Sequence, residues 1–228
     1  MKSLIVGAGE IGKSLYQALK PYYDVYLKDT DPVDVEGVQI MHICIPYSDR
    51  FVSTVKEYQK LYKPKYTVVF STVPPRTCHK LKAMHSPVEG MHPFLADSLK
   101  KSIRFLAGER DDQPQVANYF RRAHFRVYVF DQAETTELMK ILSTTKFGID
   151  IEYENEVKHQ CQRFGVPYEA WTLYLQNYNQ LYSDLGRPEY TRPMLIPIKD
   201  KKIGGHCVLP NAELLDTRFT KLLRELNK

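Results

Sequence analysis

The chain has 228 residues, of which 43% are hydrophobic and 26% charged, and its formal net charge is +5. It exceeds one typical domain in length but is short for two full ones, and its composition is ordinary for a soluble globular protein. No apolar run approaches the ~20 residues that span a bilayer, and basic residues form only small clusters, so we expect neither a membrane nor a nucleic acid as partner.

Apolar runs alternate with helical segments through the first half of the chain. This alternation predicts an α/β fold, a Rossmann-type parallel sheet covered by helices on both faces, and we expect this domain to span residues 1–131. The predicted strands are residues 2–6, 24–28, 39–45, 66–71, 83–85, 103–107 and 126–130. The predicted helices lie near residues 11–20, 48–61, 75–82 and 112–123.

A long helix is predicted near the start of the second region, residues 132–228. No proline occurs from residue 134 to 164, apolar residues recur there at helical spacing, and Gly165-Val166-Pro167 ends the pattern. A helix of some thirty residues is about 45 Å long. The short remainder of the chain cannot cover that length, so we expect a homodimer built on residues 134–164.

The remainder of the second region carries weaker signals. After Trp171 the chain becomes rich in tyrosine, and it then turns irregular through several prolines. The final segment, residues 211–226, has helical spacing, and Asn211 is the residue type that caps such a helix. We therefore expect a short C-terminal helical element after the long helix.

The most informative motif is Gly7-Ala8-Gly9-Glu10-Ile11-Gly12, which follows the apolar run Leu4-Ile5-Val6 and opens a helical segment. Between a strand and a helix, G-x-G-x-x-G is the dinucleotide fingerprint: the glycines permit a tight turn, close approach of a pyrophosphate and close helix–strand packing. A glycine-rich turn without a ligand is the alternative. The residues expected to hold a dinucleotide here are Gly7, Gly9, Glu10, Ile11, Gly12 and Asp29.

The end of the second predicted strand indicates which dinucleotide binds. Asp29 follows that strand, where a carboxylate accepts hydrogen bonds from the ribose hydroxyls and repels a 2′-phosphate. The expected cofactor is therefore NAD, although Lys13 and Lys28 leave a margin for NADP.

The four cysteines show no C-x-x-C pair and no zinc spacing, so we expect no metal site. They are expected to be free thiols in a reducing cytoplasm. The chain leads directly into a strand, so a signal peptide is not expected.

Five further segments resemble the nucleotide-sugar dehydrogenases, the UDP-glucose and GDP-mannose dehydrogenase family. Ser71–Thr77 resembles the family's S-T-V-P-P-G-T segment, with Arg76 at the glycine, and Ile43–Pro46 is similar to a strand end that lines its nicotinamide pocket. The sequences Glu137-Leu138-Met139-Lys140 and Asn155-Glu156 match its long helix, and Gly204-Gly205-His206-Cys207 matches its catalytic G-G-H-C. The matches occur in family order, and the family's second nucleotide-sugar-binding domain is expected to be missing.

The resemblance implies roles for particular residues. Ile45, Pro46, Ser71 and Thr72 would contact the cofactor, Lys140 would act as acid/base on a hydroxyl, and the Cys207 thiol would attack an aldehyde. The segment Glu89–Phe94 is more similar to the H-P segment of prephenate dehydrogenases. The expected substrate-binding residues are Glu89, His92, Asn155, Gly204 and Gly205.

Two positions depart from the family pattern. Thr144 stands where the family has asparagine, and Asn211 stands where it has aspartate. At 100° per residue, Thr144 lies about 40° and Asn155 about 60° from Lys140 around the helix, so the three share one face. We expect Lys140, Thr144, Cys207 and Asn211 to form the catalytic set, and the loss of the aspartate to reduce activation of water.

The combined expectation is NAD-dependent oxidation of an alcohol on a small-molecule substrate, a nucleotide sugar by the resemblance. One alternative is a two-electron hydroxy-acid dehydrogenase, in which Lys140 is essential and Cys207 is dispensable. Another is a non-catalytic protein that kept the dinucleotide site. The simpler interpretations of the two residues are a solvated lysine and a small buried thiol.

Overall fold

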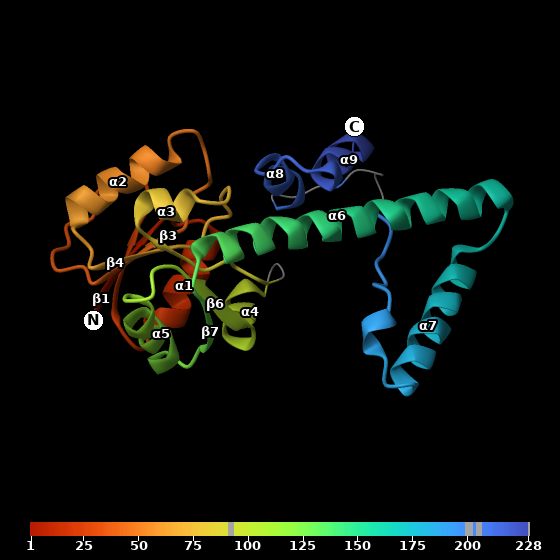
Figure 1. Ribbon diagram of the computed structural model, residues 1–228, viewed down its shortest axis with the longest axis horizontal. Coiled ribbons are helices and arrows are strands. Elements are labelled where there is room, and N and C mark those ends of the chain that lie inside the picture. Colours follow the sequence, from red (N-terminus) through yellow and green to blue (C-terminus); the bar gives the residue numbers. More distant parts are fainter. Residues whose placement is uncertain (91–93, 199–202, 204–206, 228) are drawn as a thin grey trace. The chain divides into compact units, whose positions relative to one another are not determined.

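The computed structural model describes residues 1–90, 94–198, 203 and 207–227 (Figure 1). It divides into two compact units, residues 1–140 and residues 141–228, which we call the first and second unit. The predicted end of the Rossmann-type domain at residue 131 stays a prediction.

The first unit is built on a seven-stranded sheet in the order β2-β1-β3-β4-β5-β6-β7. Its strands are β1 (Lys2–Val6), β2 (Asp24–Lys28), β3 (Ile40–Ile43), β4 (Tyr66–Val69), β5 (Met84–His85), β6 (Ile103–Ala107) and β7 (Arg126–Phe130). The predicted strand positions are confirmed. The predicted parallel sheet is confirmed with one exception: β5 and β6 are antiparallel and pair only through His85 and Ala107.

Helices cover both faces of this sheet (Figure 1). They are α1 (Glu10–Leu19), α2 (Phe51–Tyr62), α3 (Thr77–Leu81), α4 (Leu95–Lys101) and α5 (Gln113–Arg122). One apolar core joins α1, α4 and α5 to the sheet, and the other joins α2 and α3 to its opposite face. The α/β class and the helix-covered sheet are confirmed, whereas α4 was not predicted.

The long helix α6 (Ala133–Phe164) begins in the first unit and continues into the second. The second unit also contains α7 (Tyr168–Asp184), a 3-10 turn (Pro188–Tyr190), α8 (Val208–Glu213) and α9 (Arg218–Leu226). Gly148 of α6 permits close packing, because a Cβ there would lie 2.6 Å from Val208 and 2.7 Å from Leu223. The small core of this unit is therefore built from α6, α8 and α9.

The second unit contains one helix that was not predicted and corrects one expectation. The tyrosine-rich segment after Trp171 is a regular helix, α7, and only Leu175 in it is buried. The segment 211–226 is two helices rather than one, because the chain turns at residues 214–217. Asn211 is not an N-cap: it lies inside α8, whose N-cap is Cys207, and Thr217 caps α9.

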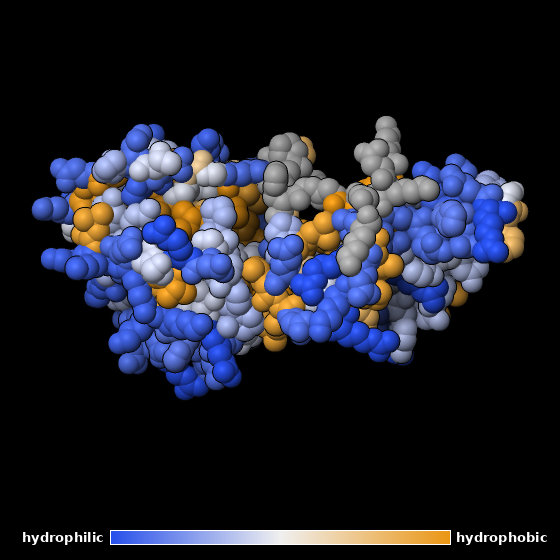
Figure 2. Space-filling view, turned by 90° about the horizontal axis from the view of Figure 1, so that it is seen from above, coloured by the Kyte–Doolittle hydropathy of each residue, from blue (hydrophilic) through white to orange (hydrophobic). Residues whose placement is uncertain are grey.

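The surface shown in Figure 2 carries hydrophobic side chains in several patches between hydrophilic ones. Large exposed apolar residues occur on α6, α7 and α9, among them Phe147, Leu173, Leu181 and Phe219. No helix among the described residues is both long and apolar enough to cross a membrane.

Candidate functional site

The glycine loop between β1 and α1 has the geometry that each of its glycines requires. Gly7 has a φ of +103°, and a Cβ on it would lie 2.5 Å from the Cys44 carbonyl oxygen. A Cβ on Gly12 would lie 1.8 Å from the Gly7 carbonyl oxygen, so α1 packs directly on the loop. A Cβ on Gly9 would meet no atom within 4 Å. The loop is thus closed on its inner side and open over Gly9, the N-cap of α1.

The fit of this loop to a dinucleotide follows from the open side. Backbone N–H groups at the first turn of α1 have no partner within the helix, and they attract an anion. The bare Cα of Gly9 lets a phosphate approach the backbone closely. Glu10 is exposed and Ile11 half-buried at the start of the same helix. Gly7, Gly9, Glu10, Ile11 and Gly12 therefore form one structural unit whose shape suits a pyrophosphate.

The end of β2 forms the neighbouring rim. Asp29 is exposed, and its Oδ1 accepts a hydrogen bond of 3.2 Å from the Ala8 backbone N–H. Lys28 is buried, and its ammonium donates to the carbonyls of Asp29, Thr30 and Asp31 at 2.9, 3.4 and 3.1 Å. The carboxylate is thus directed at the glycine loop, and the ammonium holds the turn that follows it.

The ends of β3 and β4, on the other side of β1 and its glycine loop, are tied together. The Ser71 hydroxyl donates to the Ile45 carbonyl at 2.5 Å. Thr72 and Ile45 are half-buried, and Pro46 is exposed. The four residues expected to contact the nicotinamide end of a cofactor therefore lie on adjoining strand ends of the first unit, and the bond from Ser71 fixes their spacing.

A buried histidine that the sequence analysis did not single out supports these strand ends. His85 Nε2 lies 3.2 Å from the Ser71 carbonyl, and Nδ1 lies 2.9 Å from the Thr136 hydroxyl. A carbonyl can only accept, so Nε2 carries the proton and Nδ1 accepts from Thr136. Burial lowers the pKa of His85 to about 4, so the ring is neutral at pH 7.

Glu137 lies in the segment that matches the family's long helix, and its side chain has a structural role. Its carboxylate accepts from the backbone N–H groups of Arg76 and Cys78 at 2.6 and 2.7 Å, and burial raises its pKa. Arg76 has a φ of +73° where the resembled family has glycine. Glu137 therefore stabilises a strained turn at the start of α3 from a position on α6.

Lys140 is the last residue of the first unit, and its Nζ donates to the Val88 carbonyl at 2.7 Å. The side chain is half-buried, which excludes the interpretation of a fully solvated lysine. Glu89 is exposed next to this carbonyl. Lys140 and Glu89 therefore lie near each other in the chain fold, whereas His92 lies outside the described residues.

In the second unit the two residues that depart from the family pattern touch each other. Asn211 Nδ2 donates to the Thr144 hydroxyl at 3.3 Å, and that hydroxyl donates to the Ile141 carbonyl at 3.0 Å. Asn211 is buried, and neither side chain carries a charge. Cys207 is exposed at the N-cap of α8, four residues before Asn211, so it is not a buried small hydrophobe.

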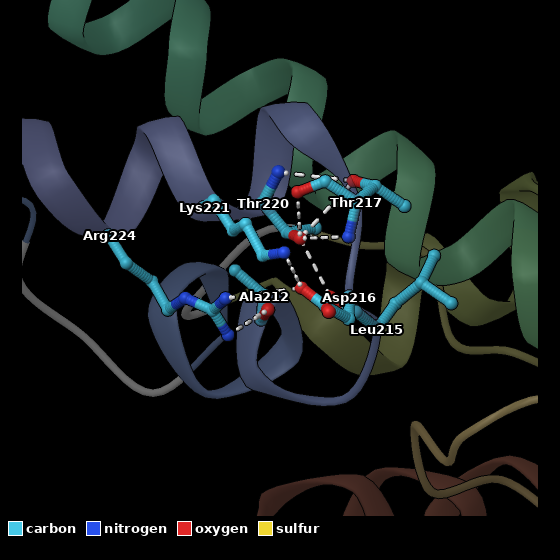
Figure 3. Close-up of polar contacts among 7 residues, drawn as sticks. All are labelled: Ala212, Leu215, Asp216, Thr217, Thr220, Lys221 and Arg224. Carbon is cyan, nitrogen blue, oxygen red and sulfur yellow. Dashed lines mark hydrogen bonds and ion pairs between the residues drawn. The ribbon is translucent and has the colours of Figure 1, made fainter.

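A polar corner holds α8 against α9 (Figure 3). The Thr217 hydroxyl accepts from the Thr220 N–H at 3.2 Å, and the Thr220 hydroxyl donates to the Leu215 carbonyl at 2.7 Å. Arg224 donates to the Ala212 carbonyl of α8 at 3.2 Å, and Lys221 pairs with Asp216 at 2.9 Å. These contacts fix the short helix that carries Cys207 and Asn211.

Asn155 lies further along α6 and contacts a backbone segment. Its Oδ1 accepts from the Ile198 N–H at 3.0 Å, and its Nδ2 lies 3.4 Å from a Glu152 oxygen. Both the oxygen and the nitrogen of the Asn155 amide therefore contact groups of the protein itself. Gly204 and Gly205 lie outside the described residues, and no group of three or more potential metal ligands occurs among the residues that are described.

No protein-family model matches the sequence, and no curated protein matches it significantly. A solved UDP-D-ManNAc dehydrogenase from Pyrococcus horikoshii matches the whole chain at 18% identity and a TM-score of 0.79, over 68% of its own length. A UDP-glucose dehydrogenase from Pyrobaculum islandicum matches 99% of the chain at 13% identity and a TM-score of 0.72, over 67% of its own length.

A second class of solved structures also matches. A 3-hydroxyisobutyrate dehydrogenase from Mycobacterium tuberculosis, solved with L-serine, covers 98% of the chain at 9% identity and a TM-score of 0.72, over 91% of its own length. The resemblance that the motifs predicted is thus confirmed in the fold: the chain is similar over its whole length to the nucleotide-sugar dehydrogenases and, in addition, to a hydroxyisobutyrate dehydrogenase.

Proposed function

We propose that this protein is an oxidoreductase that uses NAD to oxidise an alcohol group on a small molecule. The observation that carries the proposal is the open space over Gly9 in a loop that is otherwise closed by backbone contacts at Gly7 and Gly12. A loop shaped in this way excludes side chains and admits a phosphate. The similarity of fold to dehydrogenases of two classes supports the same function.

The rim at the end of β2 supports NAD rather than NADP as the cofactor. Asp29 presents a carboxylate beside the glycine loop, which favours ribose hydroxyls and opposes a 2′-phosphate. Lys28 is the nearest cation along the chain, and its three bonds to backbone carbonyls occupy all of its donors. It is therefore not available to bind a phosphate.

The chemistry that we propose divides between two side chains. Bound NAD supplies the hydride acceptor. The Lys140 amine accepts the proton of the substrate hydroxyl as the carbonyl forms. In the four-electron version, which oxidises the alcohol to an acid, Cys207 Sγ then bonds to the aldehyde carbon while its proton passes to the carbonyl oxygen. Transfer of a second hydride to a second NAD, with loss of that proton to solvent, gives a thioester, and water cleaves the thioester to the acid and the free thiol. The nucleotide-sugar substrate of the matched enzymes is the first choice to test.

A two-electron dehydrogenase is the second candidate, and two observations favour it. The Thr144–Asn211 pair is neutral, so those two positions offer no carboxylate to activate water for thioester hydrolysis. The fold is also similar to that of a 3-hydroxyisobutyrate dehydrogenase, at a TM-score of 0.72. In this version Lys140 is required and Cys207 is not.

The experiment that tests the proposal counts NADH formed per substrate consumed, with a panel of UDP-sugars and of 3-hydroxy acids. The NADH yield and turnover of Cys207→Ser are compared with those of the control variant Cys161→Ser. Lys140→Ala is compared with both cysteine variants in the same assay. We expect Lys140→Ala to lose about 10²–10⁴-fold in turnover. Two NADH per substrate and a stalled Cys207→Ser support the four-electron version. One NADH with an active Cys207→Ser supports the two-electron version.

Absence of turnover would overturn the enzymatic proposal. A protein that binds NAD in calorimetry but oxidises no member of the panel would be a non-catalytic dinucleotide-binding protein. Equal or tighter binding of NADP in the same titration would contradict the choice of cofactor.

We also propose a cytoplasmic homodimer formed through residues 134–164. The four cysteines form no disulfide, which suits a reducing compartment. Phe147 and Tyr153 on α6 are 48% and 59% exposed, and α7 adds Leu173 and Leu181, so apolar surface is available to a second copy. A monomer in light scattering at micromolar concentration would overturn the dimer.

A further inference from the structure

Two cationic side chains hold neighbouring carbonyls in the segment that follows β5. Arg104 of β6 donates from Nη1 to the Pro87 carbonyl at 2.7 Å. Lys140 of α6 donates from Nζ to the Val88 carbonyl, also at 2.7 Å. All of these residues belong to the first unit. One short peptide is therefore held by an arginine from the sheet and a lysine from the long helix.

The sequence explains why this peptide depends on side chains. The Ser86 N–H still donates to the Val69 carbonyl at 2.9 Å, which continues the pairing of β5 with β4. Pro87 has no N–H, and the β5–β6 ladder consists of the single pair His85 and Ala107. Beyond Ser86 the backbone leaves the sheet, and its buried carbonyls need other donors.

Arg104 is an unusual choice for a donor at this place. Its side chain is 1% exposed, and its Nε and Nη2 atoms have no hydrogen-bond partner in the described part of the chain. The guanidinium lies over the Phe70 ring at 5.7 Å. Burial lowers its pKa to about 10, so it remains charged at neutral pH.

Desolvation of a buried guanidinium destabilises the folded state, and no carboxylate among the described residues bonds to Arg104, although the charge of the exposed Glu89 favours its protonated form. A neutral amide could satisfy the Pro87 carbonyl without that penalty. The arginine is therefore expected to do more than fill one acceptor. The planar guanidinium bonds to the Pro87 carbonyl and lies over the Phe70 ring, and these two contacts together define its orientation and the position of that carbonyl.

We propose that Arg104 is a positioning residue for Lys140. Arg104 fixes the Pro87 carbonyl, and the carbonyl of the next residue, Val88, fixes the ammonium of Lys140. A lysine side chain has four rotatable bonds and needs such an anchor, and a displacement of about 1 Å at a catalytic group can cost about 10²-fold in rate. The catalytic meaning rests on the proposed function, whereas the positioning itself is independent of it.

The test compares Arg104→Gln, which keeps a donor but removes the charge and the fork, with the matched control Arg126→Gln. Arg126 lies on the neighbouring strand β7, is exposed, and also donates to a backbone carbonyl, that of Lys101. Acetic anhydride labels the amine of Lys140, and peptide mass spectrometry follows the rate. Hydrogen exchange of residues 86–90 is measured on the same samples.

We expect Arg104→Gln to raise the labelling rate of Lys140 severalfold and to speed exchange in residues 86–90. Arg126→Gln should leave both at the wild-type level. Arg104→Lys keeps the charge and should give intermediate rates, and it replaces Arg104→Gln if that variant does not fold. Wild-type labelling and exchange in the folded Arg104 variant would overturn the proposal.

A third measurement separates this proposal from the proposed function. In an active enzyme Arg104→Gln should lower kcat at least tenfold while the Kd for NAD stays unchanged. A protein that shows faster labelling in Arg104→Gln but oxidises no alcohol would keep the positioning role and lose the dehydrogenase. An active enzyme whose kcat and labelling are both unaffected would lose the positioning role alone.

Discussion

The glycine loop of the first unit and the α8 helix of the second unit are specified in different ways. At the glycine loop the backbone itself forms the walls, so a Cβ at Gly7 or Gly12 would overlap a carbonyl. At α8 the expected chemistry depends on side chains, and Asn211 and Thr144 form a neutral pair. A backbone requirement tolerates no substitution, whereas a side-chain site can change its chemistry and keep its fold.

The largest expected effect is that of Gly12→Ala. The added Cβ would lie 1.8 Å from the Gly7 carbonyl oxygen, which belongs to rigid backbone and cannot move aside. We expect the free energy of unfolding to fall by more than about 3 kcal/mol, the upper range for overpacked sites. Chemical denaturation measures it. The control is Gly148→Ala in the second unit, where the nearest atoms are flexible ends of Val208 and Leu223, and the loss should be smaller.

Acid should also distinguish the two units. Burial lowers the pKa of His42 to about 3 and that of His85 to about 4, both in the first unit, whereas His159 of the second unit is exposed. In the unfolded chain the two histidines take up a proton near pH 6.5, whereas in the folded chain they do so only near pH 3 and 4. The free energy of unfolding should therefore fall as pH drops from about 6.5 to 4. Each histidine contributes about 3 kcal/mol to that fall.

The control for this acid effect is His42→Phe. The ring lies among Phe70, Tyr119 and Phe120. The change removes the 3.2 Å bond between His42 Nε2 and the Tyr119 hydroxyl, and we expect that hydroxyl to keep its 2.7 Å bond to Ser3. The variant should remain folded and lose about half of the pH dependence, because one of two buried titrations is gone. Urea titrations at pH 4.5 and 7 measure the free energy of unfolding at the two pH values. A fall between them that is as large in His42→Phe as in the wild type would contradict the role of His42.

Gly9→Ala should weaken the cofactor without weakening the fold. Its φ of −69° suits alanine, and the added Cβ would meet no protein atom within 4 Å. In the proposed complex this Cβ would occupy the space of a phosphate. We expect the Kd for NAD in calorimetry to rise at least tenfold, about 1.4 kcal/mol, with the free energy of unfolding unchanged. Equal affinity for NAD would mean that the open side of the loop is not the cofactor site.

The features that the sequence predicted correctly are those with a local cause. The glycine spacing fixed the β1–α1 turn, and apolar runs located every strand. The reversal at β6 was not predictable in this way, because a strand pattern does not state its direction. Helix α7 was missed because its faces differ little: of seventeen residues only Leu175 is buried.

The supporting contacts of the candidate site could not be predicted because they join distant parts of the chain. Glu137 accepts bonds from residues about sixty positions earlier, and Arg104 acts on a carbonyl seventeen positions away. A motif match identified the Glu137 segment but not what its carboxylate touches. Asn211 was predicted to be an N-cap from its residue type alone, but it lies inside α8, and Thr217 is the residue that caps the last helix.

The smallest expected effect concerns the Thr144–Asn211 pair and completes the comparison. Thr144→Val and Asn211→Ala each remove one partner of the 3.3 Å bond, and the double variant removes both. A bond of this length between neutral groups should give a coupling free energy of about 0.5–1 kcal/mol in a double-mutant cycle measured by urea denaturation. Such a value would mean that these positions can be exchanged at little cost to the fold, in contrast to Gly12. A coupling near zero would show that the two side chains contribute to the stability of the fold separately.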